Sequence, residues 1–282
     1  MMFILKTALY PAVLTGVFSA AYALLCSRAP RILVVALFFT AAWAGLLFFA
    51  DKMIGLLFRM EKVAAEDAPE LYAIAEEISG FASMKMPEIF ILPSASGQIL
   101  SGRSLIASRI AISHGVFQAA NTEEIKGVLA QAISRLRKKE ELLVTAAAVT
   151  GGLVLFPFLA FFGDGSRERG KLKSAVYKAA FYPLHAAANF LASCSVSSRY
   201  IFDADAEGAL LCGAPLYLSS GLHKLEMLTR HFPLRNMNPS LQSLCLFKSF
   251  SSSPASIHPE IEERISILDR MARKSPLVQT LS

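Results

Sequence analysis

Residues 123–136, EEIKGVLAQAISRL, form the stretch that decides the fold. Its apolar residues recur at the spacing of one helix face: Ile125, Val128, Leu129, Ala132, Ile133 and Leu136. Just before it, Asn121 and Glu124 have the spacing of a capping box, in which each side chain bonds the backbone N–H of the other residue. The sequence therefore predicts an amphipathic helix after Asn121, whose basic end at residues 135–139 suits a helix C-terminus.

Shorter elements flank this helix on both sides. Asp67 and Glu70, around Pro69, have the spacing of another capping box, which predicts a helix up to Phe81. The string PEIFILP, residues 87–93, predicts a short strand between two prolines, and the end of 104–113 predicts a second strand. Residues 199–232 and 259–272 have helical apolar spacing. Together these elements favour the α+β class.

Long apolar runs interrupt these segments. Residues 7–26, 32–50 and 142–163 carry no charged side chain, and about 20 apolar residues suffice to span a bilayer. A fourth run, 174–198, holds Lys178 and His185, so it either spans with a functional histidine or lies partly outside lipid. We expect two transmembrane hairpins, at 1–52 and 142–198, alternating with soluble segments at 53–141 and 199–282.

Composition agrees with a membrane protein. Hydrophobic residues make up 54% of the 282 residues and charged residues 18%, which excludes a disordered chain. The net charge of +6 comes from basic residues beside the apolar runs, an arrangement that favours anionic lipid over nucleic acid. More of these basic residues flank the side that holds the soluble segments, which favours a cytoplasmic domain. The cysteines Cys26, Cys194, Cys212 and Cys245 have neither disulfide nor zinc-site spacing.

Several local strings resemble, in the same order, those of the HtpX-type membrane zinc metallopeptidases. They include MPEIFI at 86–91, GQILSGR at 97–103, SHG at 113–115, EEIKGVLAQAIS at 123–134, Ala204 with Asp205, HKLE at 223–226, NPS at 238–240 and HPEIEERI at 258–265. The resemblance implies a zincin-like metallopeptidase domain fused to about four transmembrane helices, located in a bacterial inner membrane and with a role in protein quality control. In that family, two histidines and a later glutamate hold zinc, and a glutamate between the histidines is the general base.

The residues at those four positions differ from the family pattern. The string QAISR stands in place of HExxH, which puts Gln131 and Arg135 at the histidine positions and Ala132 at the position of the base. Ile201, three residues before Ala204, takes the position of the third ligand. Arginine has no lone pair for a metal, and alanine and isoleucine have no polar atom, so the sequence predicts loss of both zinc and base. The remaining histidines are not spaced as paired ligands: His114, His185, His223, His231 and His258.

Two hypotheses describe what replaces the chemistry. In the first, Arg135, or the Gln131 amide, fills the metal position and Arg135 pairs with Asp205 or Asp203; the alternative is that Arg135 reaches lipid headgroups. In the second, an edge strand still holds an extended peptide; the alternative is a strand that only closes the domain. The residues of this predicted peptide groove are Gln98, Ile99, Leu100 and Ser101.

The expected function is therefore that of a membrane-integral, non-catalytic HtpX-like pseudopeptidase that binds or regulates membrane proteins or a partner complex. One alternative is an active zinc-dependent membrane endopeptidase with a rearranged metal site. A second alternative is a structural membrane subunit of an oligomer or complex. We expect no cofactor, or zinc under the first alternative. The expected partners are the lipid bilayer and membrane proteins or peptide segments, and no nucleic acid.

Overall fold

The computed structural model describes residues 60–150, 199–234, 239–247 and 259–274, together with residues 41 and 45. The predicted spans at 7–26 and 174–198 lie outside the described residues, as do nearly all of 32–50 and the second half of 142–163. Among the helices that are described, none has the length and apolar character needed to cross a bilayer. The boundaries at 52, 141 and 198 stay predictions.

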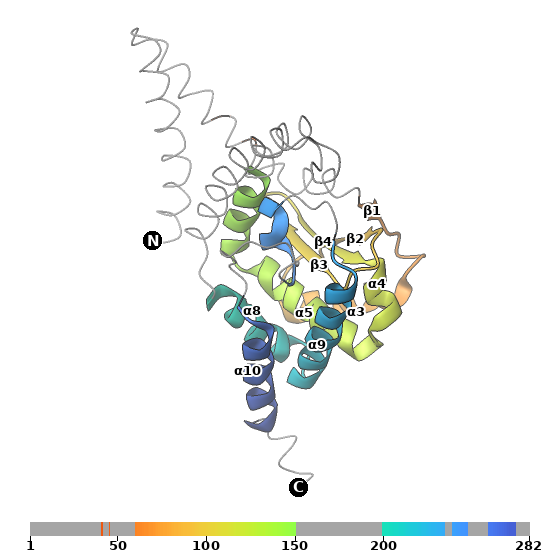
Figure 1. Ribbon diagram of the computed structural model, residues 1–282. Helices are drawn as coiled ribbons and strands as arrows, with labels where there is room; N and C mark the ends of the chain where they lie inside the picture. Colours follow the sequence, from red (N-terminus) through yellow and green to blue (C-terminus); the bar gives the residue numbers. More distant parts are fainter. Residues whose placement is uncertain are drawn as a thin grey trace, which may run out of the picture.

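A four-stranded mixed sheet forms one layer of the domain (Figure 1). Its strands lie in the order β1 (Glu61–Lys62), β2 (Glu88–Leu92), β4 (Ser108–Ser113) and β3 (Ile99–Arg103). The β2–β4 pair is parallel, and the other two pairs are antiparallel. The strand predicted at 87–93 is therefore confirmed as β2, and the strand predicted near the end of 104–113 is confirmed as β4. Strand β3 lies at an edge of this sheet.

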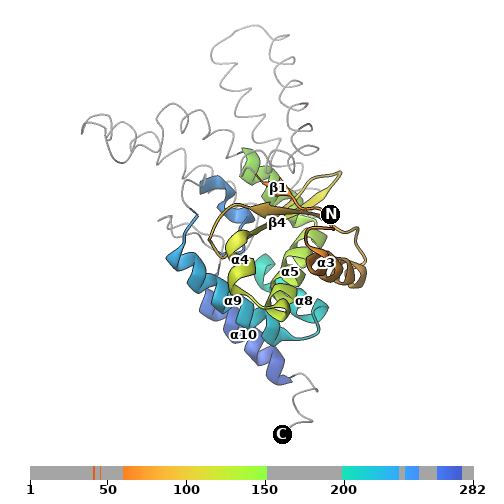
Figure 2. The ribbon, with the colours of Figure 1, turned by 90° about the vertical axis from the view of Figure 1, so that its right-hand side faces the viewer.

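Helices cover one face of the sheet (Figures 1 and 2). The central helix is α5 (Thr122–Arg137), which contacts α3 (Pro69–Phe81), α8 (Arg199–Leu211) and α9 (Pro215–His231). Helix α10 (Ile261–Lys274) packs on α9 and α8, and the short α4 (His114–Ala119) follows β4. Residues 140–150 are helical as well, and η1 (Pro239–Leu244) is a 3-10 helix.

Side chains alternate between the two faces of the sheet, as the period of a strand requires. Ile89, Ile99, Ile110 and Ile112 point into the main core with the helices. Phe90, Leu92, Leu100 and Ala111 lie on the other face in a smaller cluster that also contains Cys245. The main core therefore sits between the sheet and α5, which places α5 at the centre of the fold.

Of the two capping boxes that the sequence predicts, the structure confirms one and contradicts the other. The capping box of α5 is confirmed: Asn121 Oδ1 accepts from Glu124 N at 2.8 Å, and Glu124 Oε2 accepts from Asn121 N at 2.9 Å. The box predicted around Asp67 is wrong, because the N-cap of α3 is Ala68 and makes no side-chain capping bond. Asp67 instead lies in a turn, where its N–H donates to the Ala64 carbonyl at 3.1 Å.

The helix predicted over 199–232 is two helices. They separate at residues 212–214, where Gly213 has a φ of 76°, a left-handed conformation that favours glycine. Pro215 then begins α9, as proline commonly does at the first position of a helix. The helix predicted over 259–272 is confirmed as α10.

Candidate functional site

The four positions that correspond to metal ligands and base lie on two helices that pack together. Gln131, Ala132 and Arg135 are on α5, Ile201 is on α8, and each is at most 3% exposed. A Cβ atom added to Gly208 of α8 would lie 2.7 Å from the Cα atom of Gln131, so the two backbones cross closely here. The structure therefore brings these four residues into one buried region.

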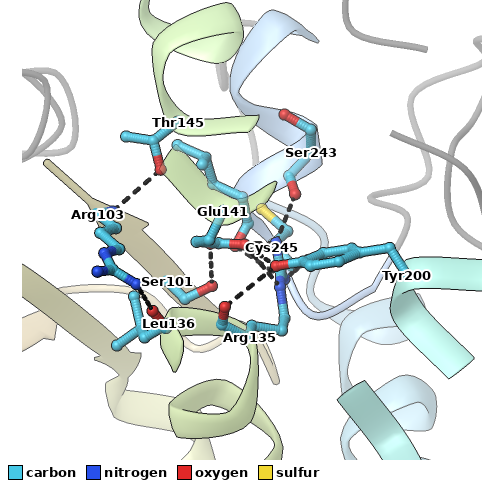
Figure 3. Close-up of polar contacts among 10 residues, drawn as sticks. Ser101, Arg103, Arg135, Leu136, Glu141, Thr145, Tyr200, Ser243 and Cys245 are labelled. Carbon is cyan, nitrogen blue, oxygen red and sulfur yellow. Dashed lines mark hydrogen bonds and ion pairs between the residues drawn. The ribbon is translucent and has the colours of Figure 1, made fainter. Parts of the chain in front are cut away.

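Arg135 is the charged centre of this region (Figure 3). Its guanidinium pairs with Glu141, with Nε 3.4 Å from Oε2 and Nη2 3.5 Å from Oε1. Nη2 donates to the Ser243 carbonyl at 2.9 Å, and Nη1 donates to the carbonyls of Cys245 at 3.0 Å and Leu244 at 3.5 Å. Burial disfavours the charged form, but the Glu141 carboxylate together with Tyr200 and Cys245 outweighs it, and the pKa of Arg135 is raised above its usual value. Arg135, which the sequence places at the predicted position of the second histidine, is thus a buried and paired cation.

Glu141 joins this cation to two further elements, β3 and α8. Ser101 of β3 donates its hydroxyl to Oε1 at 2.7 Å, and the Tyr200 hydroxyl of α8 donates to Oε2. Burial, and then the nearby Glu141 carboxylate, raise the pKa of Tyr200 well above its usual value, which keeps the hydroxyl protonated as a donor. The Tyr200 ring also lies 6.0 Å from the Arg135 guanidinium carbon, within cation–π range. Both carboxylate oxygens of Glu141 are therefore occupied.

The ion pair predicted between Arg135 and Asp205 or Asp203 is corrected by the structure. Asp205 accepts two hydrogen bonds from Arg264 of α10, each 2.7 Å long, and both side chains are at most 2% exposed. The two parallel bonds match the planar guanidinium fork to one carboxylate, so Asp205 is already neutralised. Asp203 lies on the exposed side of α8.

The alternative for Arg135, a side chain that reaches lipid headgroups, is also corrected, because Arg135 is buried. The sequence reasoning missed Glu141 as its partner. The available signal was the acidic pair at 140–141, directly between the basic end of α5 and the apolar run at 142–163.

The predicted peptide groove is filled by a segment of the same chain, residues 245–247. Leu246 N donates to the Ile99 carbonyl at 2.8 Å, and Leu100 forms an antiparallel bridge with Cys245. The Gln98 amide exchanges two hydrogen bonds with the backbone of Phe247, at 3.2 and 3.3 Å. All four predicted groove residues are at most 2% exposed. This arrangement favours the closing-strand alternative, and binding of a separate peptide stays a prediction.

The donor set does not fit a catalytic zinc ion. Zinc is held by imidazole, thiolate or carboxylate, whereas these positions offer an amide, a methyl group, a guanidinium and an alkyl chain. Gln131 Oε1 is buried without a hydrogen-bond partner, yet one neutral amide oxygen cannot replace three ligands. Elsewhere in the described ranges, no group of three His, Cys, Asp or Glu side chains could hold a metal ion.

The cysteines and histidines do not change this result. Burial raises the pKa of the Cys245 thiol to about 12, so it stays protonated beside Arg135. His114 lies on α4, and His223 and His231 lie on α9. His185 and His258 fall outside the described residues.

Comparisons with known proteins agree with the architecture. Residues 66–272 match the model of peptidase family M48. The Protease HtpX homolog of Pyrococcus furiosus is 30% identical over 289 residues, which cover 97% of each chain. The Protease HtpX homolog of Persephonella marina is 28% identical over 283 residues, which cover 96% of this chain and 98% of the relative.

A solved structure shares the fold. The crystal structure of Ste24p from S. mikatae aligns with a TM-score of 0.50 at 15% identity, and the match covers 95% of this chain and 65% of that chain. At this level of identity the likeness concerns the fold alone. The family match and the two relatives place the sequence more narrowly: the chain belongs to peptidase family M48 as an HtpX-type member.

Proposed function

We propose that the chain is a membrane-integral pseudopeptidase of the HtpX type, which acts by binding a membrane protein or a partner complex instead of cutting peptide bonds. The observation that carries this proposal is the state of Arg135. A permanent cation, bonded to Glu141 and to the carbonyls of residues 243–245, fills the position of a zinc ligand. A divalent cation brought into this buried region would be repelled by it.

The lack of a general base supports the same proposal. A base must offer a free lone pair to the proton of the attacking water. Ala132 offers none, and the buried Glu141 carboxylate already accepts from Ser101 and Tyr200 and pairs with Arg135. Glu141 is therefore a poor substitute for the missing glutamate.

The rearranged-site alternative keeps one argument, since the relatives carry the name protease. It would require donors other than those of the described residues. Purified full-length protein, loaded with zinc and then dialysed, separates the two readings by metal analysis and by casein cleavage with and without chelator. An HtpX-type relative that keeps HExxH serves as the positive control. We expect far less than one zinc per chain and no chelator-sensitive cleavage. About one zinc per chain with chelator-sensitive cleavage would reject the proposal.

The membrane part of the proposal rests on the uncharged runs at 7–26, 32–50 and 142–163. A client that binds by strand addition at β3 must first displace residues 245–247 from that edge. A diazirine analogue of leucine at position 100 tests this step. In the isolated protein it should crosslink only within the chain, near Cys245. In native membranes, binding of a client at β3 predicts an additional, heavier adduct from position 100. If heavier adducts form only from a diazirine placed in the apolar runs, and not from position 100, the structural-subunit alternative is favoured.

A further inference from the structure

The connection between β3 and β4, residues 104–107, carries an exposed apolar pair that the proposed function does not use. Leu105 is 54% exposed and Ile106 is 66% exposed, and the two are adjacent at the end of the hairpin. Arg103 and Arg109 stand on either side of this tip in the sequence RSLIASR. Other large exposed apolar side chains of the described residues occur singly along the chain, at Phe81, Leu210, Leu216, Met227 and Phe232.

The backbone of the tip is closed on itself. Ser104 N donates to the Ala107 carbonyl at 2.8 Å, and the Ser104 hydroxyl donates to the same carbonyl at 3.2 Å. The Ser104 hydroxyl oxygen also accepts from Ile106 N at 3.2 Å and from Ala107 N at 3.0 Å. Three backbone donors and one carbonyl of the tip therefore need no water, which lowers the cost of moving it into an apolar medium.

The hairpin is anchored beside the helix at 140–150, where the third predicted span starts. Arg103 N donates to the Thr145 hydroxyl at 3.0 Å, and the Arg103 guanidinium donates to the Leu136 carbonyl at 2.7 Å (Figure 3). Strands rise about 3.3 Å per residue, so Leu105 and Ile106 lie within roughly 13 Å of the Thr145 hydroxyl. Figures 1 and 2 both draw the β3–β4 connection and the helix at 140–150 at the upper end of the domain.

Charge around the tip suits an anionic surface. The Arg103 guanidinium also contacts the Arg137 carbonyl at 3.3 Å, which links the hairpin to the basic end of α5. Basic residues outnumber acids there: Arg103, Arg137, Lys138 and Lys139 against Glu140 and Glu207. Apolar side chains framed by cations are the composition of segments that lie in a lipid interface.

We propose that the Leu105 and Ile106 tip inserts into the bilayer interface beside the third predicted span. This inference rests on the membrane part of the proposed function. The span and the tip then give the domain two points of contact with lipid, which together fix its orientation over the membrane. Arg103 serves both contacts, since its backbone bonds the helix and its side chain caps α5.

The single tryptophan of the chain makes a direct test available. Trp43 lies in the run 32–50, so the wild-type protein reports on membrane integration, and Trp43→Phe with Ile106→Trp reports on the tip. Both are reconstituted into phosphatidylglycerol–phosphatidylcholine vesicles with acyl-brominated phosphatidylcholine as quencher. We expect the tip tryptophan to lose about half of its fluorescence, more with bromine at shallow than at deep carbons, as an interfacial position requires. The Trp43→Phe, Leu216→Trp variant is the matched control, because Leu216 is also 53% exposed and belongs to the start of α9, the end of that helix farther from the helix at 140–150 (Figure 1); its fluorescence should change little.

The outcomes separate the inference from the proposed function. Quenching of wild-type Trp43 without quenching at position 106 overturns the inference alone. A tip tryptophan that is shielded from aqueous iodide but not quenched by lipid overturns it too, since a protein partner would then cover the tip. Absence of quenching at Trp43 rejects the membrane part of the proposed function. If Ile106→Trp lowers the unfolding midpoint, Leu105→Trp replaces it under the same criteria.

Discussion

Two buried arginines, Arg135 and Arg264, hold the segment at 243–247 from two sides. Arg264 bonds Asp205 through two contacts of 2.7 Å and the Leu246 carbonyl at 2.9 Å. Arg135 has a looser pair with Glu141, at 3.4 and 3.5 Å, and spreads its other bonds over the carbonyls of residues 243–245. Arg264 and Asp205 belong to strings that resemble the family, whereas the same resemblance predicts that Arg135 takes the position of a zinc ligand.

The difference shows how a buried guanidinium is held at a position that the sequence resemblance assigns to a zinc ligand. Zinc and a guanidinium both place positive charge between elements of the fold, but they require opposite partners. Zinc needs lone pairs from histidine and glutamate, while a guanidinium donates protons to oxygen atoms. The surroundings of Arg135 are accordingly a carboxylate and three carbonyls. Arg135 thus links α5 to η1 and to the helix at 140–150.

The largest expected effect comes from breaking each pair at its carboxylate. Asp205→Asn replaces a charged acceptor with two bonded oxygens by one neutral amide oxygen, so Arg264 keeps the Leu246 carbonyl and at most that oxygen; it should lower the free energy of unfolding by about 3–5 kcal/mol. Glu141→Gln makes the same change but leaves Arg135 with three carbonyl acceptors besides the amide oxygen, and should cost about 1.5–3 kcal/mol. Urea unfolding in detergent measures both. Should Glu141→Gln prove the more costly variant, Arg135 would depend on its carboxylate as much as Arg264 does, and the comparison would fail.

A pair of double-mutant cycles sharpens the same comparison. Arg135→Ala with Glu141→Ala should show a coupling energy of about 0.5–3 kcal/mol, because the two side chains share an ion pair. Arg135→Ala with Asp205→Ala should couple by less than about 0.5 kcal/mol, since Asp205 is bonded to Arg264. A larger coupling energy in the second cycle than in the first would instead support the ion pair between Arg135 and Asp205 that was predicted from the sequence.

Local sequence signals predicted the helices and strands of this site, but not the contacts between residues that are far apart in the sequence. The Asn121 and Glu124 box and the apolar spacing of α5 act within a few residues, so the helix and its register could be read directly. The contact between Gln98 and Phe247 joins residues 149 positions apart, and no local pattern encodes it. Likewise, the sequence offers Asp205 many basic residues as possible partners, at many different separations along the chain. Only the packing of α10 against α8 selects Arg264 among them.

The close crossing at Gln131 gives an effect of intermediate size. Alanine at Gly208 would place a Cβ atom 2.7 Å from the Gln131 Cα atom, so α8 must move away from α5, at a cost of about 1–3 kcal/mol. Gly80 of α3 is the matched control, because a Cβ atom there meets nothing within 4 Å. Gly80→Ala should raise stability by up to about 1 kcal/mol through helix propensity. Equal effects of the two changes would mean that α5 and α8 do not constrain each other at this position.

The smallest effect concerns Tyr200, whose hydroxyl donates to Glu141 beside Arg135. The ring beside Arg264 in the described residues is Phe247, which has no hydroxyl to donate to Asp205. Tyr200→Phe removes one hydrogen bond to a charged acceptor and should cost about 1.5 kcal/mol at neutral pH. Burial, followed by the Glu141 carboxylate, raises the pKa of Tyr200 in the folded protein, so its stabilising contribution is complete below the unfolded pKa near 10 and is lost as the pH rises beyond it. The wild type should therefore lose stability above pH 10 more steeply than Tyr200→Phe does.

Tyr217→Phe, at a more exposed tyrosine bonded to Glu123, should change this slope less. Identical slopes for wild type and Tyr200→Phe would mean that Glu141 does not keep the Tyr200 hydroxyl protonated, and that water reaches the ion pair of Arg135 and Glu141.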